Sequence, residues 1–253
     1  MFTRAIVRTP CRAMVDGLTS ADLGLPDYAK ALHQHRDYVQ ALEECGLQVT
    51  VLPADEAYPD STFVEDVALM TPRCAILTNP GAPTRRGEVA SMRATLANFC
   101  TYIENIDAPG TVEAGDIMMV GDRFYIGLSE RTNEAGAVQM IAILQKHGMQ
   151  GSMVELTEVL HLKTGLGYLE HNNLLACGEF LHKPEFQAFT LLEVEPDEAY
   201  AANSVWINGT VLTPKGFPKT RELMASAGYE IREVDVSEFQ KLDGGLSCLS
   251  LRF

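Results

Sequence analysis

Four residues with reactive side chains lie at similar places in a repeating pattern along the chain. Asp66, Glu113 and His161 are separated by 47 and 48 residues, and Cys248 follows a Gly-Gly pair near the end of the sequence. An ionised thiol is a strong nucleophile, and a neighbouring imidazole can act as its acid and base. A carboxylate can orient the imidazole or bind a cationic substrate. The pattern therefore predicts a cysteine nucleophile with a histidine partner, if folding brings these positions together.

The elements around these residues repeat with the same period. Each predicted unit contains a β-hairpin, a helix and a further strand within roughly 50 residues. In the clearest copies the hairpin, helix and strand are 67–78, 89–99 and 103–106, then 117–126, 137–144 and 153–156, then 204–213, 221–227 and 229–234. A partial copy has a strand at 5–7, a helix at 27–45 and a strand at 49–52. An irregular copy runs from Asn173 through a Cys177-Gly178 turn to Leu192, with a short helical piece near Pro184.

This repeat predicts the fold class. Five units indicate a five-bladed, pseudo-symmetric α/β propeller of ββαβ units, with residues 1–253 as a single catalytic domain. In a ring of repeats, equivalent loops meet at the axis, so residues one period apart become neighbours. A doubly wound α/β domain is less favoured, because hairpins need antiparallel pairs and no glycine-rich dinucleotide loop follows an early strand.

Composition excludes several classes of protein. The formal net charge of −14 argues against nucleic-acid partners, because phosphate binding needs clustered Lys and Arg. No apolar run approaches the roughly 20 residues of a membrane span, so no membrane partner is expected. Six scattered cysteines without a C-x-x-C pair are typical of reduced thiols in a cytoplasmic protein. All except Cys248 are predicted to be small buried apolar side chains: Cys11, Cys45, Cys74, Cys100 and Cys177.

Further charged residues suggest the substrate. Asp60, Glu65 and Asp66 come just before one predicted hairpin, and ionised carboxylates match a planar guanidinium in a bidentate fork. Arg85 and Arg131 follow two consecutive hairpins at corresponding places and can pair with a carboxylate of the substrate. These groups together indicate a zwitterionic, arginine-like small molecule. The main rival of His161 as acid and base is His171, whose strand-like setting favours a structural hydrogen bond.

Five motifs resemble those of the dimethylarginine dimethylaminohydrolases, which belong to the guanidine-modifying superfamily. They are Phe63-Val64-Glu65-Asp66, Arg85-Arg86-Gly87-Glu88, Glu113-Ala114-Gly115-Asp116, His161-Leu162-Lys163-Thr164-Gly165 and Asp243-Gly244-Gly245-Leu246-Ser247-Cys248. The match extends from Arg8 to the last residue. The resemblance implies a five-bladed α/β propeller that needs no metal or other cofactor. It also implies hydrolysis of asymmetric dimethylarginine and monomethylarginine to citrulline and a methylamine, through a covalent S-alkylthiouronium on cysteine.

The same resemblance implies roles for individual residues. Cys248 corresponds to the nucleophile, His161 to the general acid and base, and Glu113 to a carboxylate that binds the guanidinium. The other implied substrate-binding residues are Leu18, Asp60, Phe63, Glu65, Asp66, Arg85, Arg131, Leu242 and Ser247. Within this set, Leu18 and Leu242 correspond to backbone contacts, and Leu18 lies in a loop that could act as a lid.

Three alternatives remain open at this stage. An arginine deiminase-type hydrolase would share the cysteine chemistry and release ammonia from arginine. A metal-dependent hydrolase would lose activity on chelation, and Cys248, His161 and a carboxylate could also bind Zn²⁺ adventitiously. A non-catalytic amino-acid-binding module would keep its function when Cys248 is replaced by Ser. Exposed propeller edges are compatible with a homodimer.

Overall fold

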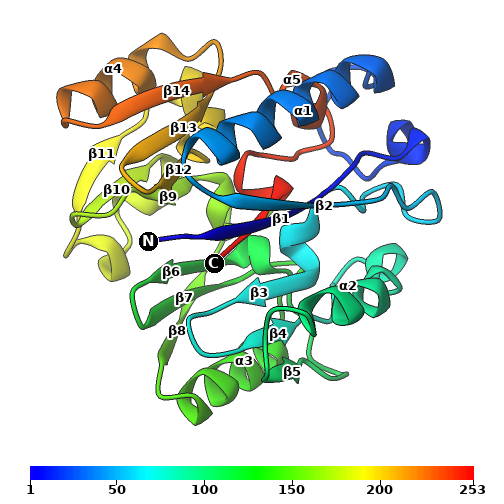
Figure 1. Cartoon of the computed structure of the whole chain (residues 1–253). Coiled ribbons are helices and arrows are strands. Elements are labelled where there is room, and N and C mark those ends of the chain that lie inside the picture. The colour runs from blue at the N-terminus through cyan, green and yellow to red at the C-terminus, as the bar shows by residue number, and fades with distance from the viewer. The chain divides into compact units, whose positions relative to one another are not determined.

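The computed structural model describes all 253 residues, which form five three-stranded sheets in two compact units (Figure 1). Unit 1 comprises residues 1–64 and 165–253, and unit 2 comprises residues 65–164. In every sheet the middle strand pairs antiparallel with one neighbour and parallel with the other. A hairpin supplies the antiparallel pair in four of the sheets, and the parallel strand follows a crossover. The predicted set of five repeated units is confirmed, whereas the single domain stays a prediction.

Unit 1 contains three of the sheets. The first joins the two ends of the chain, with the order β15 (Leu251–Arg252), β1 (Arg4–Arg8) and β2 (Gln48–Leu52). The second contains β9 (Leu166–Tyr168), β10 (Asn173–Ala176) and β11 (Thr190–Glu193). The third contains β12 (Val205–Ile207), β13 (Thr210–Pro214) and β14 (Glu230–Val234). Its helices are α1 (Tyr28–Glu44), α4 (Pro218–Ser226) and α5 (Ser237–Gln240).

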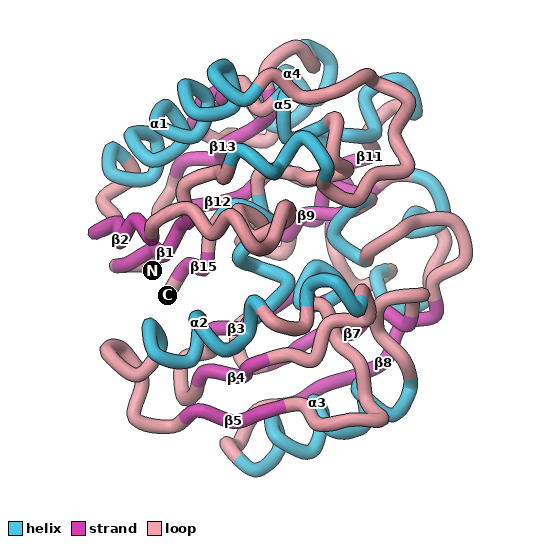
Figure 2. Tube along the Cα trace, turned by 90° about the vertical axis from the view of Figure 1, so that its right-hand side faces the viewer, coloured by secondary structure: helices cyan, strands magenta, loops and turns pink.

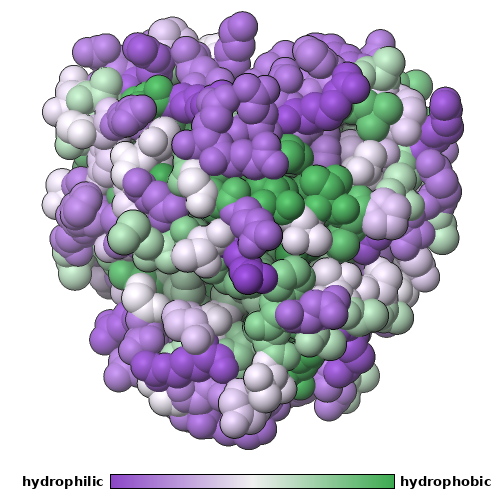
Figure 3. Space-filling model, viewed as in Figure 1, coloured by the Kyte–Doolittle hydropathy of each residue, from purple (hydrophilic) through white to green (hydrophobic).

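Helix α1 occupies the range that the sequence predicts. Its N-cap is Asp27, whose Oδ1 accepts a hydrogen bond from the backbone N–H of Lys30 at 3.0 Å. Gly46, at φ +87°, follows its C-terminal end in the left-handed conformation that favours glycine. The buried face carries Tyr38 and Leu42, and α1 contacts β2, β14 and α5. In Figure 3, hydrophilic side chains cover the region of α1, and a more apolar area lies around β2, where Val51 is 49% exposed.

Unit 2 contains the other two sheets. One has β3 (Ala68–Met70), β4 (Ala75–Leu77) and β5 (Ile103–Asn105), and the other has β6 (Ile117–Val120), β7 (Arg123–Leu128) and β8 (Gln150–Glu155). Helix α2 (Glu88–Leu96) packs against β4, and α3 (Glu134–Lys146) packs against β7 and β8 (Figure 2). The helical spacing of Met140 and Leu144 puts both side chains in the same buried cluster as Phe124 and Ile126.

A short 3-10 turn precedes the antiparallel outer strand of every sheet. These turns are η2 (Val64–Val67) before β3, η4 (Ala114–Asp116) before β6, η5 (Leu162–Thr164) before β9, η8 (Pro196–Ala202) before β12 and η9 (Ser247–Leu249) before β15. Asp66 and Cys248 lie within such turns, and Glu113 and His161 come immediately before them. The reactive residues are therefore regularly spaced in the sequence because each lies at a similar place in its own repeated unit.

The irregular fourth copy differs from its prediction. Its hairpin turn connects β9 and β10 through Glu170, His171 and Asn172, all at φ between +53° and +65°. The predicted turn at Cys177-Gly178 is the start of the 3-10 turn η6 (Gly178–Leu181), and the short helical piece predicted near Pro184 is the 3-10 turn η7 (Pro184–Phe186). The predicted start of this copy at Asn173 was therefore wrong, because it leaves out β9 and the turn after it, in which three residues without glycine take up the left-handed conformation. His171 lies exposed in this turn, so its predicted strand-like setting was also wrong.

Two further predictions concern burial and membranes. Cys11, Cys74 and Cys177 are buried as expected, whereas Cys45 and Cys100 are only partly buried. None of the helices has the length and apolar character that crossing a bilayer requires.

Candidate active site

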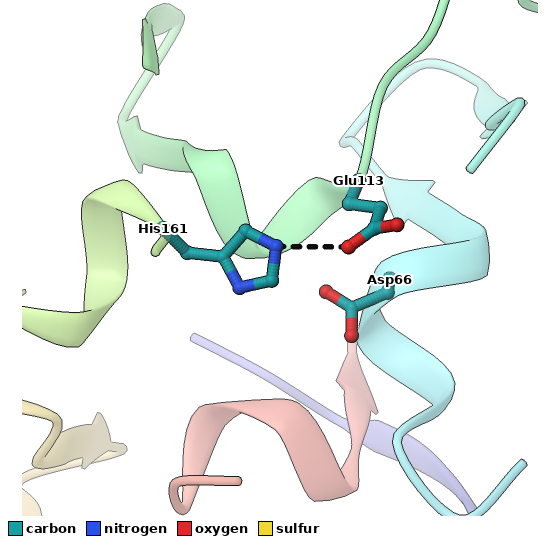
Figure 4. Close-up of side chains that lie close together, drawn as sticks. All are labelled: Asp66, Glu113 and His161. Atoms are coloured by element: carbon teal, nitrogen blue, oxygen red, sulfur yellow. Dashed lines mark hydrogen bonds and ion pairs between the residues drawn. The ribbon is translucent and has the colours of Figure 1, made fainter. Parts of the chain in front are cut away.

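Three side chains of unit 2 point toward one another from three separate turns (Figure 4). Nε2 of His161 lies 2.9 Å from Oε2 of Glu113, and one ligand atom from each of Asp66, Glu113 and His161 lies within 4.8 Å of the others. The two carboxylates are buried, and the imidazole is 13% exposed. The prediction that residues one repeat apart meet is confirmed for this cluster.

Gly115 makes this close approach possible. A β-carbon at this position would lie 2.8 Å from Oδ1 of Asp66 and 3.0 Å from Nδ1 of His161. The backbone N–H of Gly115 also donates to Oδ1 of Asp66 at 3.2 Å. Glycine therefore serves here by leaving room for the imidazole and the carboxylate.

The surrounding charges keep His161 protonated at neutral pH. Burial lowers the pKa of its imidazole, because the charged form loses solvation. The hydrogen bond with Glu113 and the negative charges of Asp66 and Asp116 outweigh burial and raise the pKa to about 9. At neutral pH the imidazolium can therefore donate a proton.

A buried ion-pair network holds Asp66 in place. Nη1 of Arg85 lies 2.6 Å from Oδ2 of Asp66, and Nε and Nη2 of Arg85 each donate to Glu88 at 2.9 Å. Burial tends to raise the pKa of Asp66, but the charge and hydrogen bond of Arg85, together with the charges of His161 and Lys163, outweigh burial and lower that pKa. Three N–H donors of Arg85 thus serve carboxylates of the protein, and its predicted contact with a substrate carboxylate stays a prediction.

Arg131 differs from Arg85 in its surroundings. It follows β7 at the place that corresponds to Arg85 after β4, and its guanidinium forms no ion pair or hydrogen bond within the protein. Its backbone approaches Gly81 so closely that a β-carbon on Gly81 would lie 2.4 Å from the carbonyl oxygen of Arg131. The neighbouring Ala82 donates its N–H to Oε1 of Glu113 at 2.9 Å. The loops that carry Arg131 and Glu113 are thereby held together.

The donor atoms of the acidic cluster fit an ion-pair network better than a metal site. Asp66 already pairs with Arg85, and Glu113 accepts from Ala82 and pairs with His161. A metal ion would compete with a guanidinium and would require a deprotonated imidazole. The predicted site residue Glu65 is also paired, since Nζ of Lys163 lies 2.5 Å from its Oε1.

The thiol lies in a different set of segments, within unit 1. Sγ of Cys248 accepts a hydrogen bond from the N–H of Gly245 at 3.4 Å, and its side chain is only partly buried. Asn203 accepts from the N–H of Ser247 at 2.9 Å and donates to its hydroxyl at 3.0 Å. The hydroxyl of Tyr38 donates to the carbonyl of Leu246 at 2.9 Å. Polar contacts on both sides therefore position the turn that carries the thiol.

The remaining predicted residues of unit 1 surround the same turn. Oδ1 of Asp60 accepts from the N–H of Leu18 at 3.0 Å, and Leu18 itself is 41% exposed. Phe63 lies against Gly244, where a β-carbon would come within 2.1 Å of its ring. Leu242 is buried, and its Cδ1 would lie 3.3 Å from a β-carbon on Gly17. The segments that contain Leu18, Asp60, Phe63, Leu242, Ser247 and Cys248 thus adjoin one another.

Sequence reasoning missed several residues that support these side chains. Glu88, Asp116, Lys163 and Asn203 are four polar residues that each contact a predicted site residue or its neighbour. Three of them, Glu88, Asp116 and Lys163, are polar residues inside the motifs named above. Their place in these motifs could have indicated that they support the site. Asn203 lies outside the motifs, and its signal was its position before β12, which corresponds to the reactive positions of the other units.

Comparison with solved structures first defines the class of fold. The product-bound N-terminal domain of an arginine dihydrolase from cyanobacteria has a TM-score of 0.88 with this chain at 20% identity, covering 100% of this chain and 97% of that chain. At that identity the likeness concerns the fold alone. Together with the five three-stranded sheets, it confirms the predicted α/β propeller class of ββαβ units.

A stronger likeness defines the family. The chain is 61% identical to an N(G),N(G)-dimethylarginine dimethylaminohydrolase of Pseudomonas aeruginosa, over 254 residues and 100% of both chains. The family described as "N,N dimethylarginine dimethylhydrolase, eukaryotic" matches residues 26–183. The chain therefore belongs to the dimethylarginine dimethylaminohydrolase family.

Two solved structures show what members of this family bind. Each has a TM-score of 0.99 with the chain, 61% identity and 100% coverage of both chains. One is a histidine-to-glycine variant of dimethylarginine dimethylaminohydrolase as an adduct with S-methyl-L-thiocitrulline. The other is a cysteine-to-serine variant of the Pseudomonas aeruginosa enzyme complexed with citrulline.

Proposed function

We propose that this protein hydrolyses Nω-methylated arginines, asymmetric dimethylarginine and monomethylarginine, to citrulline and a methylamine. The observation that carries the proposal is the full-length 61% identity to a dimethylarginine dimethylaminohydrolase. The citrulline complex and the thiocitrulline adduct of its relatives agree with this substrate class. In the cluster of Asp66, Glu113 and His161, the carboxylates supply the negative charge that binds a guanidinium. The imidazolium supplies the proton that the departing amine requires.

Cys248 is proposed as the nucleophile and His161 as the general acid and base. In the related structures, the substituted histidine and cysteine each carry a number one higher than His161 and Cys248. Cys248 is also the cysteine that stands in the closing Gly-Gly motif, with its Sγ accepting a backbone N–H. A donor directed at sulfur favours the thiolate over the neutral thiol.

The first half of the reaction forms a covalent intermediate. The Cys248 thiolate attacks the guanidinium carbon and forms a C–S bond, giving a tetrahedral adduct. The imidazolium of His161 donates its proton to the methylated nitrogen, and the C–N bond breaks to release dimethylamine or methylamine. The product on the enzyme is an S-alkylthiouronium, and His161 is now neutral.

The second half returns the enzyme to its starting state. Neutral His161 removes a proton from water, and the resulting hydroxide adds to the thiouronium carbon. Collapse of this second adduct breaks the C–S bond, leaving citrulline and the Cys248 thiolate. The excess proton of the guanidinium leaves with the amine or passes to solvent. His161 thus acts first as acid and then as base.

The carboxylates are proposed to hold the cationic end of the substrate. Glu113 binds the guanidinium and keeps His161 protonated, and Asp66 adds negative charge beside the imidazole. Asp60 and Glu65 are proposed as further pocket carboxylates, with Phe63 and Ser247 completing the pocket. Arg131 and Arg85 are proposed to bind the substrate carboxylate, while Leu18 and Leu242 contribute backbone contacts.

The test compares three substrates. Purified protein receives asymmetric dimethylarginine, monomethylarginine or arginine, and citrulline is measured against methylamines and ammonia. We expect citrulline with dimethylamine or methylamine, and loss of turnover in Cys248→Ser. Ammonia released preferentially from arginine would instead establish the alternative, an arginine deiminase-type hydrolase, which the fold-level likeness to an arginine dihydrolase leaves as a second candidate. Full activity after exhaustive chelation would exclude a metal-dependent hydrolase.

Two broader proposals accompany this function. The scattered cysteines, all free in the structure, support a cytoplasmic location. A homodimer is compatible with the exposed Val51 of edge strand β2, and light scattering of the purified protein measures its oligomeric state.

A further inference from the structure

Asp116 is a buried carboxylate with no cationic residue bonded to it. Its side chain is 0% exposed and follows Glu113 by three positions, in the same turn. Oδ1 accepts the backbone N–H of Leu162 at 2.9 Å, and Oδ2 accepts the hydroxyl of Ser129 at 2.7 Å. Burial raises the pKa of this carboxyl, although the nearby His161 charge and the side chains of Ser129 and Thr132 lower it. Burying a charge without a directly bonded ion-pair partner is unfavourable, so this carboxylate needs a reason to be present.

Each partner of Asp116 leads to a different residue of the candidate active site. Leu162 directly follows His161 and begins the turn η5. The hydroxyl oxygen of Ser129 accepts the N–H of Arg131 at 3.0 Å. Ser129 also accepts the N–H of Thr132 at 3.1 Å, and the hydroxyl of Thr132 in turn accepts the N–H of Glu113 at 3.1 Å.

Only an acceptor with two oxygens satisfies this arrangement. Ser129 already accepts from two backbone N–H groups, those of Arg131 and Thr132, so its own proton must go to an acceptor. The N–H of Leu162 needs an acceptor as well. A carboxylate serves both, whereas an amide offers one oxygen and presents an NH₂ group to the other partner. The negative charge also faces the protonated imidazole of His161.

We propose that Asp116 is a positioning residue that fixes His161, Glu113 and Arg131 relative to one another through a buried hydrogen-bond relay of Leu162, Ser129 and Thr132. The proposal rests on the proposed function, since it assigns these three residues to acid–base chemistry, guanidinium binding and substrate-carboxylate binding. It predicts that the branches of the relay have separable kinetic effects. The hydrogen bond that Oδ1 accepts from Leu162 positions the general acid His161. The hydrogen bond that Oδ2 accepts from Ser129 positions the loop of Arg131.

The experiment measures kcat and KM for asymmetric dimethylarginine in two variants. Asp116→Asn preserves shape but leaves either Ser129 or Leu162 without an acceptor, so we expect kcat to fall about 10- to 100-fold through misplacement of His161 and Glu113. Ser129→Ala removes the hydroxyl that accepts from the N–H of Arg131 and keeps the bond from Leu162. We expect its KM to rise about 10-fold with kcat within about threefold of wild type, because substrate-carboxylate binding weakens.

The matched control is Asp122→Asn, the same change at an exposed position of the β6–β7 hairpin, where Asp122 pairs with Arg73. We expect its kcat and KM to equal those of wild type. Wild-type kcat and KM in folded Asp116→Asn would overturn the proposal. If Asp116→Asn does not fold, Ser129→Ala decides: an unchanged KM overturns the relay, and a raised KM at near-normal kcat supports it. Folded wild-type protein that releases no methylamine would contradict the proposed function instead.

Discussion

Nε2 of His161 lies 2.9 Å from Oε2 of Glu113, so this ring nitrogen is paired with a carboxylate and Nδ1 is left as the nitrogen that we propose to exchange a proton. The pKa of about 9 means that Nδ1 carries a proton at neutral pH. In the first half of the proposed reaction His161 donates a proton to the departing amine, so it starts in the form that this half needs. A histidine with an ordinary pKa would instead be largely uncharged at neutral pH.

The first prediction concerns the alkaline limit of activity. The active form of His161 is the imidazolium, which is lost as pH rises through its pKa, so wild-type kcat/KM should fall above about pH 9. In Glu113→Gln the charged hydrogen bond is lost, and the pKa moves down toward the ordinary value. We expect the alkaline limb to shift by about 1 to 2 pH units toward acid, and kcat to fall at least about 100-fold. Kinetics between pH 6 and 10 measure both effects.

A second Glu–His pair in unit 2 offers the control for this measurement. Oε1 of Glu104 lies 2.7 Å from Nε2 of His147, and the other partner of Glu104 is Lys146, which is not a predicted site residue. Glu104→Gln should leave the alkaline limb unchanged. A limb that stays near pH 9 in Glu113→Gln would show that another group sets it.

The second prediction concerns stability. Asp66→Asn removes one partner of the buried Arg85 charge and leaves Glu88 as the other. Breaking a buried pair leaves an uncompensated charge, so we expect the free energy of unfolding to fall by about 3 kcal/mol, measured by urea unfolding. Asp197→Asn, at the exposed pair with Lys219, is the control and should unfold at the same urea concentration as wild type. Equal stability of Asp66→Asn and wild type would mean that Glu88 alone neutralises Arg85.

The repeat could be predicted because its signals are local. Hairpin turns such as Asn208-Gly209 and the glycines after α1, α3 and α4 follow from backbone preferences at single positions. The fourth unit lacks these signals, since its turn has no glycine and its helix is replaced by 3-10 turns. There the predicted copy begins at Asn173 and leaves out β9 and the turn from Glu170 to Asn172.

The meeting of Asp66, Glu113 and His161 could be predicted, but the contacts that the supporting residues make could not. Glu113 and Asp116 are both acidic residues of one motif, and only the turn η4 shows that the first faces His161 while the second lies beneath the backbone of Leu162. The pairing of Arg85 with Asp66 and Glu88 likewise depends on distances that sequence spacing does not contain. Such polar networks depend on the positions of side chains in three dimensions, whereas motif spacing gives only the order of the residues along the chain.

The third prediction tests the close approach at Gly115. In Gly115→Ala the added methyl group would lie 2.8 Å from Asp66 and 3.0 Å from His161, both of which are held by other contacts. We expect kcat to fall at least about 10-fold and stability to fall by about 1 to 3 kcal/mol. The control is Gly121→Asn in the β6–β7 turn, where a β-carbon meets nothing within 4 Å and asparagine tolerates φ +58°. Wild-type kcat and KM in Gly115→Ala would show that Asp66 and His161 can move apart without loss of activity.

The fourth prediction concerns the turn that carries the thiol. Asn203 holds Ser247 by two hydrogen bonds, and Asn203→Ala removes both while leaving Cys248 itself unchanged. We expect kcat to fall about 10- to 100-fold through misplacement of the nucleophile, while all six thiols still react after denaturation. Alkylation of native protein by iodoacetamide, followed by peptide mapping, should show a changed rate at Cys248 alone. The exposed Asn98→Ala, which loses only a bond to the carbonyl of Ala94, should behave as wild type. A wild-type alkylation rate together with wild-type kcat in Asn203→Ala would mean that Tyr38 and Gly245 position the turn without Asn203.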